Sequence, residues 1–501
     1  MKSYPRTPES QEVELKLSLP GANPTELAKR LGSLPLLAGG KATRQSLHNI
    51  YFDTADQHLR RQRAALRLRR IGSAVHPQWV QTLKSSAADE SALSRRGEWE
   101  TAVPSAQLSL QALQSTPWTE MDPDTRLFDS LEPCFVTDFQ RTSWLLTRPD
   151  GSVVELALDI GQIEANGRQA SICEIELELK SGQVGALFEV AQRIAITVAV
   201  LPANQSKAER GFLLAQDGLD QPKGANPPPI GQHLSQTGLA QQVLREMFAQ
   251  FTHNLNALRS NDDPELVHQA RVGWRRFRSA MRLFKKLPQM ANAPVWPELA
   301  ALLSFLGELR NLEVALLETL PPLANGYCRG DEQRTQSWQE MLTSLRHMTD
   351  VQRRVVRDTL QEPGVGVSLL LISEWLENLT VTEDVDQKTT SLLRQWAKRR
   401  ILRLDHGLKR AQQATDTPEQ QHRVRIRAKR LRYGVQALHN LLPARFANRS
   451  SDKAAILQTA IGVRRDLFQA SVLVATLNPD HGIVQYLLGV VVGSCMAAQL
   501  T

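Results

Sequence analysis

The sequence predicts an α+β chain, with an antiparallel β region in its first two-fifths and an all-α region in the rest. Three observations lead to this prediction. Short runs that alternate charged and apolar residues recur early in the chain, as in half-buried strands. A segment rich in Pro, Gly, Gln and Asn follows, which is typical of a linker. Beyond it, apolar residues recur with the period of a helix.

The strand-like runs carry their charges on one face only. These runs are residues 12–16, 66–69, 80–84, 98–100, 153–159 and 174–178. A polar face turned to water is the ordinary explanation for one such run. Because the pattern recurs, we expect the runs to close into a barrel with the charged faces inward and the apolar faces under covering helices. Carboxylates in that lumen would bind hard divalent cations, and basic residues would bind phosphate oxygens.

Local signals predict the elements between these runs. Asn23 followed by Pro24 predicts the start of a helix after the first strand. The turn at residues 148–151 predicts a hairpin between two strands. Residues 85–97 lack a clear period and are expected to form a loop.

Length and composition set the outer limits. A chain of 501 residues should contain two or three domains, and 42% hydrophobic with 22% charged residues is ordinary for a globular protein. The net charge of +8 favours an anionic partner. The four cysteines, Cys134, Cys173, Cys328 and Cys495, have no metal-ligand spacing and are expected to be reduced.

We expect a cytoplasmic protein, because residues 1–11 contain no apolar segment of a secretory signal. The apolar residues 482–500 are barely long enough to span a membrane, and no basic residue closes the segment. They are expected to form a buried terminal helix, so no membrane partner is predicted.

The helical region contains an internal repeat. Residues 268–278 align with residues 422–432 at an offset of 154, and residues 306–312 align with 461–467. We predict two copies of a four-helix unit. The first basic stripe consists of His268, Arg271, Arg275, Arg278 and Arg282 on one helix face, and the second of His422, Arg425, Lys429 and Arg432. A solvated face is the usual explanation for such charges. These stripes lack acidic partners, so we expect them to hold an anion.

Six motifs in order resemble the CYTH superfamily, the triphosphate tunnel metalloenzymes, over roughly residues 10–215. They are the ExExK opening at Glu12, Glu14 and Lys16, then Tyr51-Phe52-Asp53-Thr54, Leu66-Arg67-Leu68-Arg69, Thr82-Leu83-Lys84, Glu174-Ile175-Glu176-Leu177-Glu178 and Ser206-Lys207. The resemblance implies an eight-stranded antiparallel β tunnel that hydrolyses inorganic triphosphate to diphosphate and phosphate, with Mg²⁺ or Mn²⁺ as cofactor.

The resemblance also implies residue roles. The expected metal ligands are Glu12, Glu14, Asp159, Glu174 and Glu176, with Glu178 as a sixth ligand or a structural acid at the tunnel mouth. The expected phosphate-binding residues are Arg67, Arg69, Lys84, Arg141 and Lys207. Lys16 either joins these bases or lowers the pKa of a nearby group. Glu98 and Glu100 are candidates for activating water, and either could equally orient Lys84 or an arginine.

The repeated basic helix, with a Gly-x-x-Arg-Asn/Asp element after each copy, resembles the CHAD domain over roughly residues 235–501. This resemblance implies inorganic polyphosphate binding, with Arg310 and Arg465 joining the two stripes. The first copy departs from the pattern at Gly273 and Asn311. The expected domains are therefore residues 1–216 (CYTH), a linker at 217–234, and residues 235–501 (CHAD).

Three alternatives stay open. The tunnel could hydrolyse thiamine triphosphate or cyclise ATP to cyclic AMP, or the chain could be a polyphosphate-binding scaffold with little turnover. The basic helices could instead bind nucleic acid. We do not expect nucleic acid binding, because Trp274 and Phe277 lie on the face opposite the basic stripe, where stacked bases could not reach them.

Overall fold

A computed structural model of the protein describes residues 11–497 apart from residues 22, 38, 73–74, 76, 87–90, 228–233, 380–386, 414–416 and 478–479. The chain forms two compact units. The first consists of Met1–Gln221 with Arg259–Asn261 and Leu360–Glu374, and the second consists of Pro222–Leu258, Asp262–Thr359 and Trp375–Thr501. Part of the expected linker, residues 228–233, lies outside the described residues.

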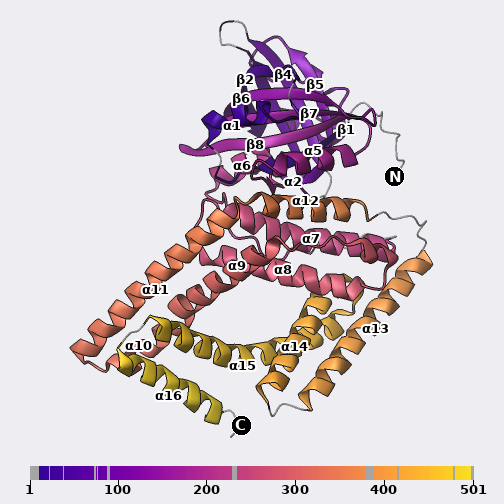
Figure 1. The fold of residues 1–501 in the computed structure, drawn as a ribbon. Coiled ribbons are helices and arrows are strands. Elements are labelled where there is room, and N and C mark those ends of the chain that lie inside the picture. Colours follow the sequence, from indigo (N-terminus) through magenta and orange to yellow (C-terminus); the bar gives the residue numbers. More distant parts are fainter. Residues whose placement is uncertain are drawn as a thin grey trace. The chain divides into compact units, whose positions relative to one another are not determined.

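The first unit is built on a closed antiparallel barrel of eight strands, as predicted (Figure 1). The strands are β1 (Gln11–Ser18), β2 (Thr43–Asp53), β3 (Ala64–Ile71), β4 (Gln78–Ser86), β5 (Leu93–Val103), β6 (Glu132–Thr147), β7 (Val153–Ala165) and β8 (Arg168–Ser181). They pair in the order β5-β4-β3-β2-β6-β7-β8-β1, and the pairing of β1 with β5 closes the barrel. A short strand, β9 (Leu201–Pro202), also pairs with β1.

The outward faces of the strands are apolar, as the alternation predicts. Leu15 and Leu17 of β1 are fully buried in a core with Leu31 and Phe188. These two partners belong to α1 (Pro24–Gly32) and α5 (Gly185–Ala195), which cover this side of the barrel. The Asn23 side chain accepts a hydrogen bond from the Thr25 backbone N–H, so α1 begins where the sequence predicts. Short helices complete the unit: α2 (His58–Arg61), α3 (Trp118–Met121), α4 (Arg126–Asp129) and a 3₁₀ turn at Gln111–Leu113.

The inward faces are not charged along their whole length, which corrects the expectation of a charged tunnel throughout. Phe135 and Phe139 share the inward face of β6 with Arg141, and Tyr51 stacks on Phe135 with ring centroids 4.6 Å apart. These aromatic residues pack against Phe212 of α6 (Lys207–Ala215) in one apolar core. Helix α6 and this core therefore fill one end of the lumen, and the charged residues line the remainder.

The expected loop at residues 85–97 is only partly correct. Strand β5 begins at Leu93 and pairs with β1, so that Arg96 lies opposite Glu12. The segment shows little apolar alternation because one face, which includes Arg96, lines the charged lumen, and Leu93 on the other face is its one large apolar residue in the outer core. This environment hides the strand from a search for hydrophobic periodicity.

The first unit also includes a segment from far along the chain. Helix α12 spans Pro363–Glu377, and its residues up to Glu374 belong to this unit. Leu370 is fully buried in the core that contains Leu17 and Phe188. The Gln192 side-chain amide donates a hydrogen bond to the Glu374 carboxylate over 2.7 Å. The outer core of the barrel is therefore completed by residues that the expected boundaries assign to the helical domain.

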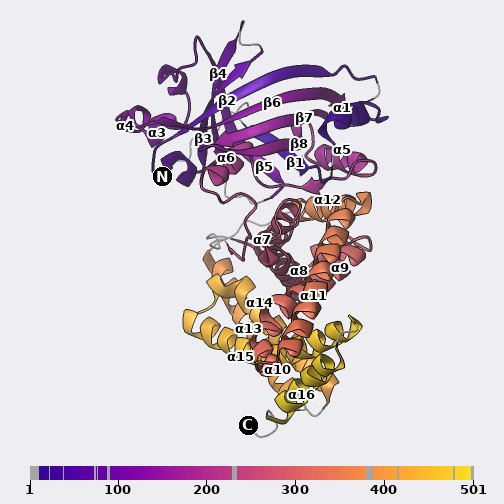
Figure 2. The same ribbon diagram turned by 90° about the vertical axis from the view of Figure 1, so that its left-hand side faces the viewer.

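The second unit is all-α, as predicted. Its helices are α7 (Gln236–Ala257), α8 (Pro264–Phe284), α9 (Leu299–Val314), α10 (Ala324–Cys328), α11 (Glu332–Thr359), α13 (Gln387–Gln412), α14 (Pro418–Leu438), α15 (Ala444–Thr476) and α16 (His481–Ala497). Helix α14 begins at Pro418 and ends at Leu438, each 154 residues after the corresponding end of α8. The long helices α7, α8, α9 and α11 thus have counterparts in α13, α14, α15 and α16. Helices α8 and α14 pack against each other (Figure 2).

Buried apolar side chains pack the helices of this unit against one another. Trp274 and Phe277 of α8 are buried, as expected for the face opposite the first basic stripe. In α16, Ile483 and Leu487 are fully buried, whereas 57% of Val492 is exposed, so the terminal helix is buried on one side only. Within the described residues, no helix combines the length and the apolar character that a membrane span requires. Cys134, Cys173 and Cys328 are free thiols.

Candidate functional sites

The first candidate site is an acidic cluster in the barrel lumen. Asp159 on β7 lies directly opposite Glu174 on β8, and Glu176 follows on the same face of β8. Each of the three offers a carboxylate oxygen, and these oxygens lie within 4.8 Å of one another. Asp159 is fully buried and 4% of Glu174 is exposed, so repulsion between these charges is poorly screened by water.

Three basic side chains neutralise this acidic cluster. Nζ of Lys207, the first residue of α6, lies 2.6 Å from Asp159, 2.6 Å from Glu174 and 2.8 Å from Glu176. The Arg141 guanidinium donates two hydrogen bonds to Asp159, over 2.8 and 2.7 Å. Lys16 lies 2.9 Å from Glu174 and also pairs with Glu176. The cluster therefore holds three acids and three bases in a buried volume.

These contacts keep the two glutamates ionised. Burial alone would raise the pKa of Glu174, but Lys16 and Lys207 lower it to about 2. The same two lysines, with Arg141, outweigh burial at Glu176 and hold its pKa well below the ordinary value.

Glu14 behaves differently from its neighbours. Burial and the adjacent Glu176 raise the pKa of Glu14, despite the opposing effect of Lys16 at 3.4 Å. Its buried Oε1 accepts no hydrogen bond. A buried anionic oxygen that accepts no hydrogen bond is stabilised by a cation that contacts it directly.

A second group of charges lies on β1, β3, β4 and β5. Nζ of Lys84 lies 2.8 Å from Glu12 and 3.0 Å from Glu98. Arg67 contacts Glu98 at 3.4 Å and Glu100 at 3.3 Å. The contacts of Glu98 and Glu100 are thus with bases, the arrangement that would orient Lys84 and Arg67.

Arg69 has no acidic partner among the described residues. Its Nε donates a hydrogen bond to the Asn49 side-chain oxygen over 2.8 Å. Burial and the nearby Arg67 and Arg141 lower the pKa of Arg69 to about 10. An arginine destabilised in this way gains from contact with an anion such as phosphate.

Glu178 stands apart from the acidic cluster. It pairs with Lys180 at 2.7 Å, and Lys180 also contacts Glu155 at 2.9 Å. The Glu178 side chain is 29% exposed, unlike the buried acids of the cluster. These contacts place Glu178 in a pair with Lys180 and apart from Asp159, Glu174 and Glu176.

Two basic residues that the sequence patterns did not predict, Arg96 and Arg210, also act on the acids of the lumen. Burial tends to lower the pKa of Arg96, but Glu14 and Glu12 raise it above its ordinary value. Arg210 of α6 lies 3.5 Å from Glu174. The alternation of Ser94, Arg96 and Glu98 carries a signal for Arg96, whereas Arg210 depends on the docking of α6 and has no such signal.

The donor set fits a hard divalent cation. The acidic cluster offers carboxylate oxygens only, which are the ligands that Mg²⁺ and Mn²⁺ prefer over nitrogen or sulfur. Glu14 adds a buried oxygen that accepts no hydrogen bond. In the structure, Lys16 and Lys207 supply the positive charge that these acids require.

The second candidate site is formed where the two basic stripes converge. It contains Arg271 and Arg275 of α8, Arg310 of α9, Arg425 and Lys429 of α14, and Arg465 of α15, and we call these six residues the basic cluster. Burial, Arg275, Arg465 and Arg310 together lower the pKa of Arg271 to about 10. The buried Nε and Nη1 of Arg425 have no hydrogen-bond acceptor. The two halves of the repeat therefore contribute to one electropositive site.

Other residues of the stripes lie outside the basic cluster or at its edge. Arg278 and Arg282 are exposed, as is His422. Arg432 donates a hydrogen bond to Gln458 over 3.1 Å. His268 is half-buried, and burial together with Arg310 lowers its pKa. The two histidines that the repeat aligns thus occupy different environments.

Family models match both parts of the chain, a CYTH domain over residues 10–212 and a CHAD domain over residues 242–475. The chain carries a CYTH domain followed by a CHAD domain. The CYTH domain is 32% identical over 206 residues to the inorganic triphosphatase of Haemophilus influenzae. That alignment covers 41% of this chain and 55% of the relative, so the chain spans about half the length of this curated protein.

Solved structures of both kinds of domain are also similar to the chain. The CHAD domain from the plant Ricinus communis is 24% identical, with a TM-score of 0.46, and the match covers 55% of this chain and 91% of that one. A putative adenylyl cyclase from Hippeastrum, described as having a dominant triphosphatase activity, is 18% identical, with a TM-score of 0.28. That match covers 42% of this chain and 96% of the Hippeastrum protein.

One departure of the CHAD domain from its usual pattern has a packing explanation. A Cβ atom on Gly273 would lie 2.9 Å from the backbone N of Phe251 and 3.2 Å from the backbone O of Met247. Helices α7 and α8 approach so closely at this point that only glycine fits. Gly273 is therefore required for helix packing and lies away from the basic face.

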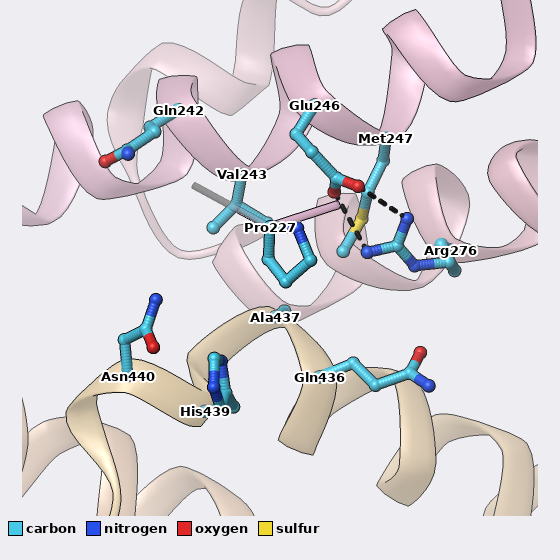
Figure 3. Close-up of a pocket in the computed structure, with 10 residues that line it drawn as sticks. All are labelled: Pro227, Gln242, Val243, Glu246, Met247, Arg276, Gln436, Ala437, His439 and Asn440. Atoms are coloured by element: carbon cyan, nitrogen blue, oxygen red, sulfur yellow. Dashed lines mark hydrogen bonds and ion pairs between the residues drawn. The ribbon is translucent and has the colours of Figure 1, made fainter. Parts of the chain in front are cut away.

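The CHAD domain also contains a pocket between α7 and the end of α14 (Figure 3). At its floor the Arg276 guanidinium pairs with the Glu246 carboxylate, with two contacts of 2.9 Å, and both side chains are buried. Arg276 adjoins Arg275 in sequence, but its side chain lies outside the basic stripe and pairs with Glu246 of α7. Its charge is satisfied inside the protein, in contrast to the charges of the basic cluster.

Proposed function

We propose that the CYTH domain hydrolyses inorganic triphosphate with the help of a divalent cation. The observation that carries this proposal is the buried lumen itself, where three carboxylates within 4.8 Å of one another adjoin Lys16, Lys207 and Arg141. Phosphoryl transfer depends on positioning and on neutralising charge, and this lumen offers acids for a metal and bases for phosphate oxygens. The 32% identity to an inorganic triphosphatase supports the same substrate.

The proposed roles follow from the contacts. Glu12, Glu14, Asp159, Glu174 and Glu176 would hold Mg²⁺ or Mn²⁺, which when bound supplies positive charge next to the phosphate oxygens. Arg69 is available to bind a terminal phosphate, since Asn49 is its only described hydrogen-bond partner. Arg67, Lys84, Arg141 and Lys207 pair with acids in the structure and would share their charge with phosphate oxygens. Lys16 keeps Glu174 and Glu176 ionised, so that they can serve as ligands.

Glu98 and Glu100 are the candidates for activating the attacking water. Thr82 donates a hydrogen bond to Glu100 over 3.0 Å, and Arg67 and Arg69 lower the pKa of Glu100 against the effect of burial. A carboxylate with a lowered pKa is a weak base. We therefore favour an orienting role for Glu100 and keep Glu98 as the candidate base.

We further propose that the CHAD domain binds inorganic polyphosphate at the basic cluster. Arg425 has two buried donors without acceptors, and guanidinium groups from four helices interact electrostatically there. A phosphate chain carries acceptor oxygens and negative charge along its length, so it could contact several of these guanidinium groups at once. Affinity should fall steeply with salt, as for any polyanion held by many basic side chains. Weak salt dependence in the full-length protein would contradict this site.

A phosphate-release assay tests the catalytic proposal. The purified full-length protein is incubated with inorganic triphosphate, ATP or thiamine triphosphate, with Mg²⁺, with Mn²⁺ or with EDTA. We expect metal-dependent release that is fastest from inorganic triphosphate. Faster release from thiamine triphosphate would identify that compound as the preferred substrate. No release from any of the three would favour a polyphosphate-binding scaffold with little turnover.

A further inference from the structure

Lys429 is the single lysine of the basic cluster. The charged groups that act on its amine are Arg275 and Arg271 of α8, Arg425 of its own helix, one turn away, and Arg465 of α15. Among the described residues, Lys429 has no acidic partner and makes no hydrogen bond through its side chain. The nearest acids are engaged with other bases, since Asp466 acts on Arg425 and Glu318 pairs with Arg310 at 2.7 Å. Lys429 is thus a half-buried amine among four guanidinium groups.

This environment changes the state of the amine. Burial and then Arg275, Arg425, Arg465 and Arg271 lower the pKa of Lys429 to about 7. About half of the Lys429 amines are then neutral at pH 7, against roughly one in 2,500 for a lysine with an ordinary pKa near 10.4. Only the neutral amine is a nucleophile, so Lys429 is activated in the way that catalytic and Schiff-base lysines are.

We propose that Lys429 is a site of acylation by acyl phosphates. The phosphate group of the reagent would bind to the surrounding arginines, which places the acyl carbon beside the lysine nitrogen. The nitrogen attacks this carbon, a C–N bond forms, and the bond between the acyl carbon and the phosphate oxygen breaks. The amine proton passes to the departing phosphate, so the products are an N-acyl lysine and hydrogen phosphate. No oxidant or further reactant is required.

The inference rests on the proposed polyphosphate site, because the same arginines would bind both anions. Acylation removes the charge that Lys429 carries when an anion is bound, so it should weaken polyphosphate binding. Conversely, a bound polyphosphate chain should protect Lys429, both by covering it and by stabilising the protonated amine. The site would therefore report whether acyl phosphate or polyphosphate is in excess.

The test follows acetylation of individual lysines by mass spectrometry after the full-length protein is incubated with acetyl phosphate at pH 7. Lys409 is the internal reference, since it is 61% exposed and pairs with Asp405 at 3.2 Å. We expect Lys429 to react at least ~10-fold faster than Lys409, because the lower basicity of the amine offsets only part of its greater neutral fraction. Equal rates at the two lysines would overturn the proposal.

A second reagent separates phosphate recognition from simple reactivity. Acetic anhydride is neutral and carries no phosphate, so its reaction with Lys429 should not require docking at the arginines. Inorganic phosphate should therefore slow acetylation by acetyl phosphate more than acetylation by the anhydride, which it slows only by stabilising the protonated amine. Arg425→Gln should slow the reaction with acetyl phosphate, and Arg423→Gln, an exposed arginine of the same helix, is the matched control. If phosphate failed to compete, or if both variants behaved alike, the proposed docking of the reagent would be wrong.

A binding measurement distinguishes this inference from the proposed function. If polyphosphate does not bind although Lys429 is acetylated selectively, the inference stands and the binding proposal fails. If polyphosphate binds but acetylation is not selective, the inference alone fails.

Discussion

The strongest test of the acidic cluster is Lys207→Met, which removes one cation and keeps a side chain of similar length. The ordinary pKa of 4.5 and the pKa of about 2 for Glu174 in the structure differ by about 3 kcal/mol in free energy. Lys16 and Lys207 share this effect, and they also lower the pKa of Glu176. Loss of Lys207 should therefore cost about 3 kcal/mol, at the lower end of the range for breaking a buried ion pair.

Hydrogen exchange of the β7 and β8 amides measures this cost locally in the full-length protein. At neutral pH, 3 kcal/mol corresponds to exchange that is roughly 150-fold faster in the variant. Because the folded-state pKa of Glu174 is depressed, its contribution is present above about pH 4.5 and is lost as the pH falls toward 2. The difference between wild type and variant should shrink over that window.

The matched control is Lys180→Met on β8, the strand that carries Glu174 and Glu176. Lys180 is 40% exposed and pairs with Glu178 and Glu155 near the barrel rim, where ion pairs contribute about 0–1 kcal/mol. Exchange in β7 and β8 that is the same in Lys207→Met as in the control would refute the view that Lys207 compensates buried ionised acids. Added Mg²⁺ should slow exchange in both proteins if the acidic cluster binds the metal.

Four further predictions concern other features of the chain. Glu14→Gln should abolish metal-dependent phosphate release with the fold intact, because an amide is a poor ligand for a hard cation, whereas Glu155→Gln should be nearly neutral. Lys84→Ala should raise the triphosphate concentration required and slow turnover; an unchanged rate would place Lys84 outside the site. Polyphosphate affinity at fixed ionic strength should increase as the pH falls from 8 to 6, because a bound anion raises the pKa of Lys429 from about 7 and that of His268. Lys429→Met should remove most of this slope and the His268→Ala, His422→Ala double variant a smaller part; a slope that survives all three changes would contradict the assignment. Leu370→Ala should destabilise the barrel by about 2–5 kcal/mol, seen as faster exchange in α5, although it lies beyond the expected end of the CYTH domain.

Strand alternation predicts the charged face of the barrel because a strand fixes which side chains share a side. Glu12, Glu14 and Lys16 face the same lumen as Glu174 and Glu176 for this reason. Arg96 was not predicted because residues 85–97 show little hydrophobic alternation, although Ser94, Arg96 and Glu98 share one face of β5. The apolar core at one end of the lumen was missed as well, since it depends on the docking of α6, a contact between segments far apart in sequence.

In the helical domain, too, the pattern within one segment could be predicted and the packing between segments could not. The repeat predicts two matching basic helices, and their common offset is confirmed by α8 and α14. Their convergence on one basic cluster depends on how the helices pack, which the repeat does not encode. For the same reason the aligned His268 and His422 look equivalent in sequence, although one is half-buried beside Arg310 and the other is exposed.

The aromatic end of the lumen has a consequence for longer substrates. Phe135, Phe139 and Phe212 form an apolar core at the end of the lumen where α6 docks, which disfavours passage of a charged chain through that end. On this basis a linear phosphate chain would enter by one of its ends rather than thread through the barrel. On the proposed activity, cleavage of a long chain would be restricted to its terminal anhydride bonds, and the released piece would have to leave through the mouth before the next terminus enters.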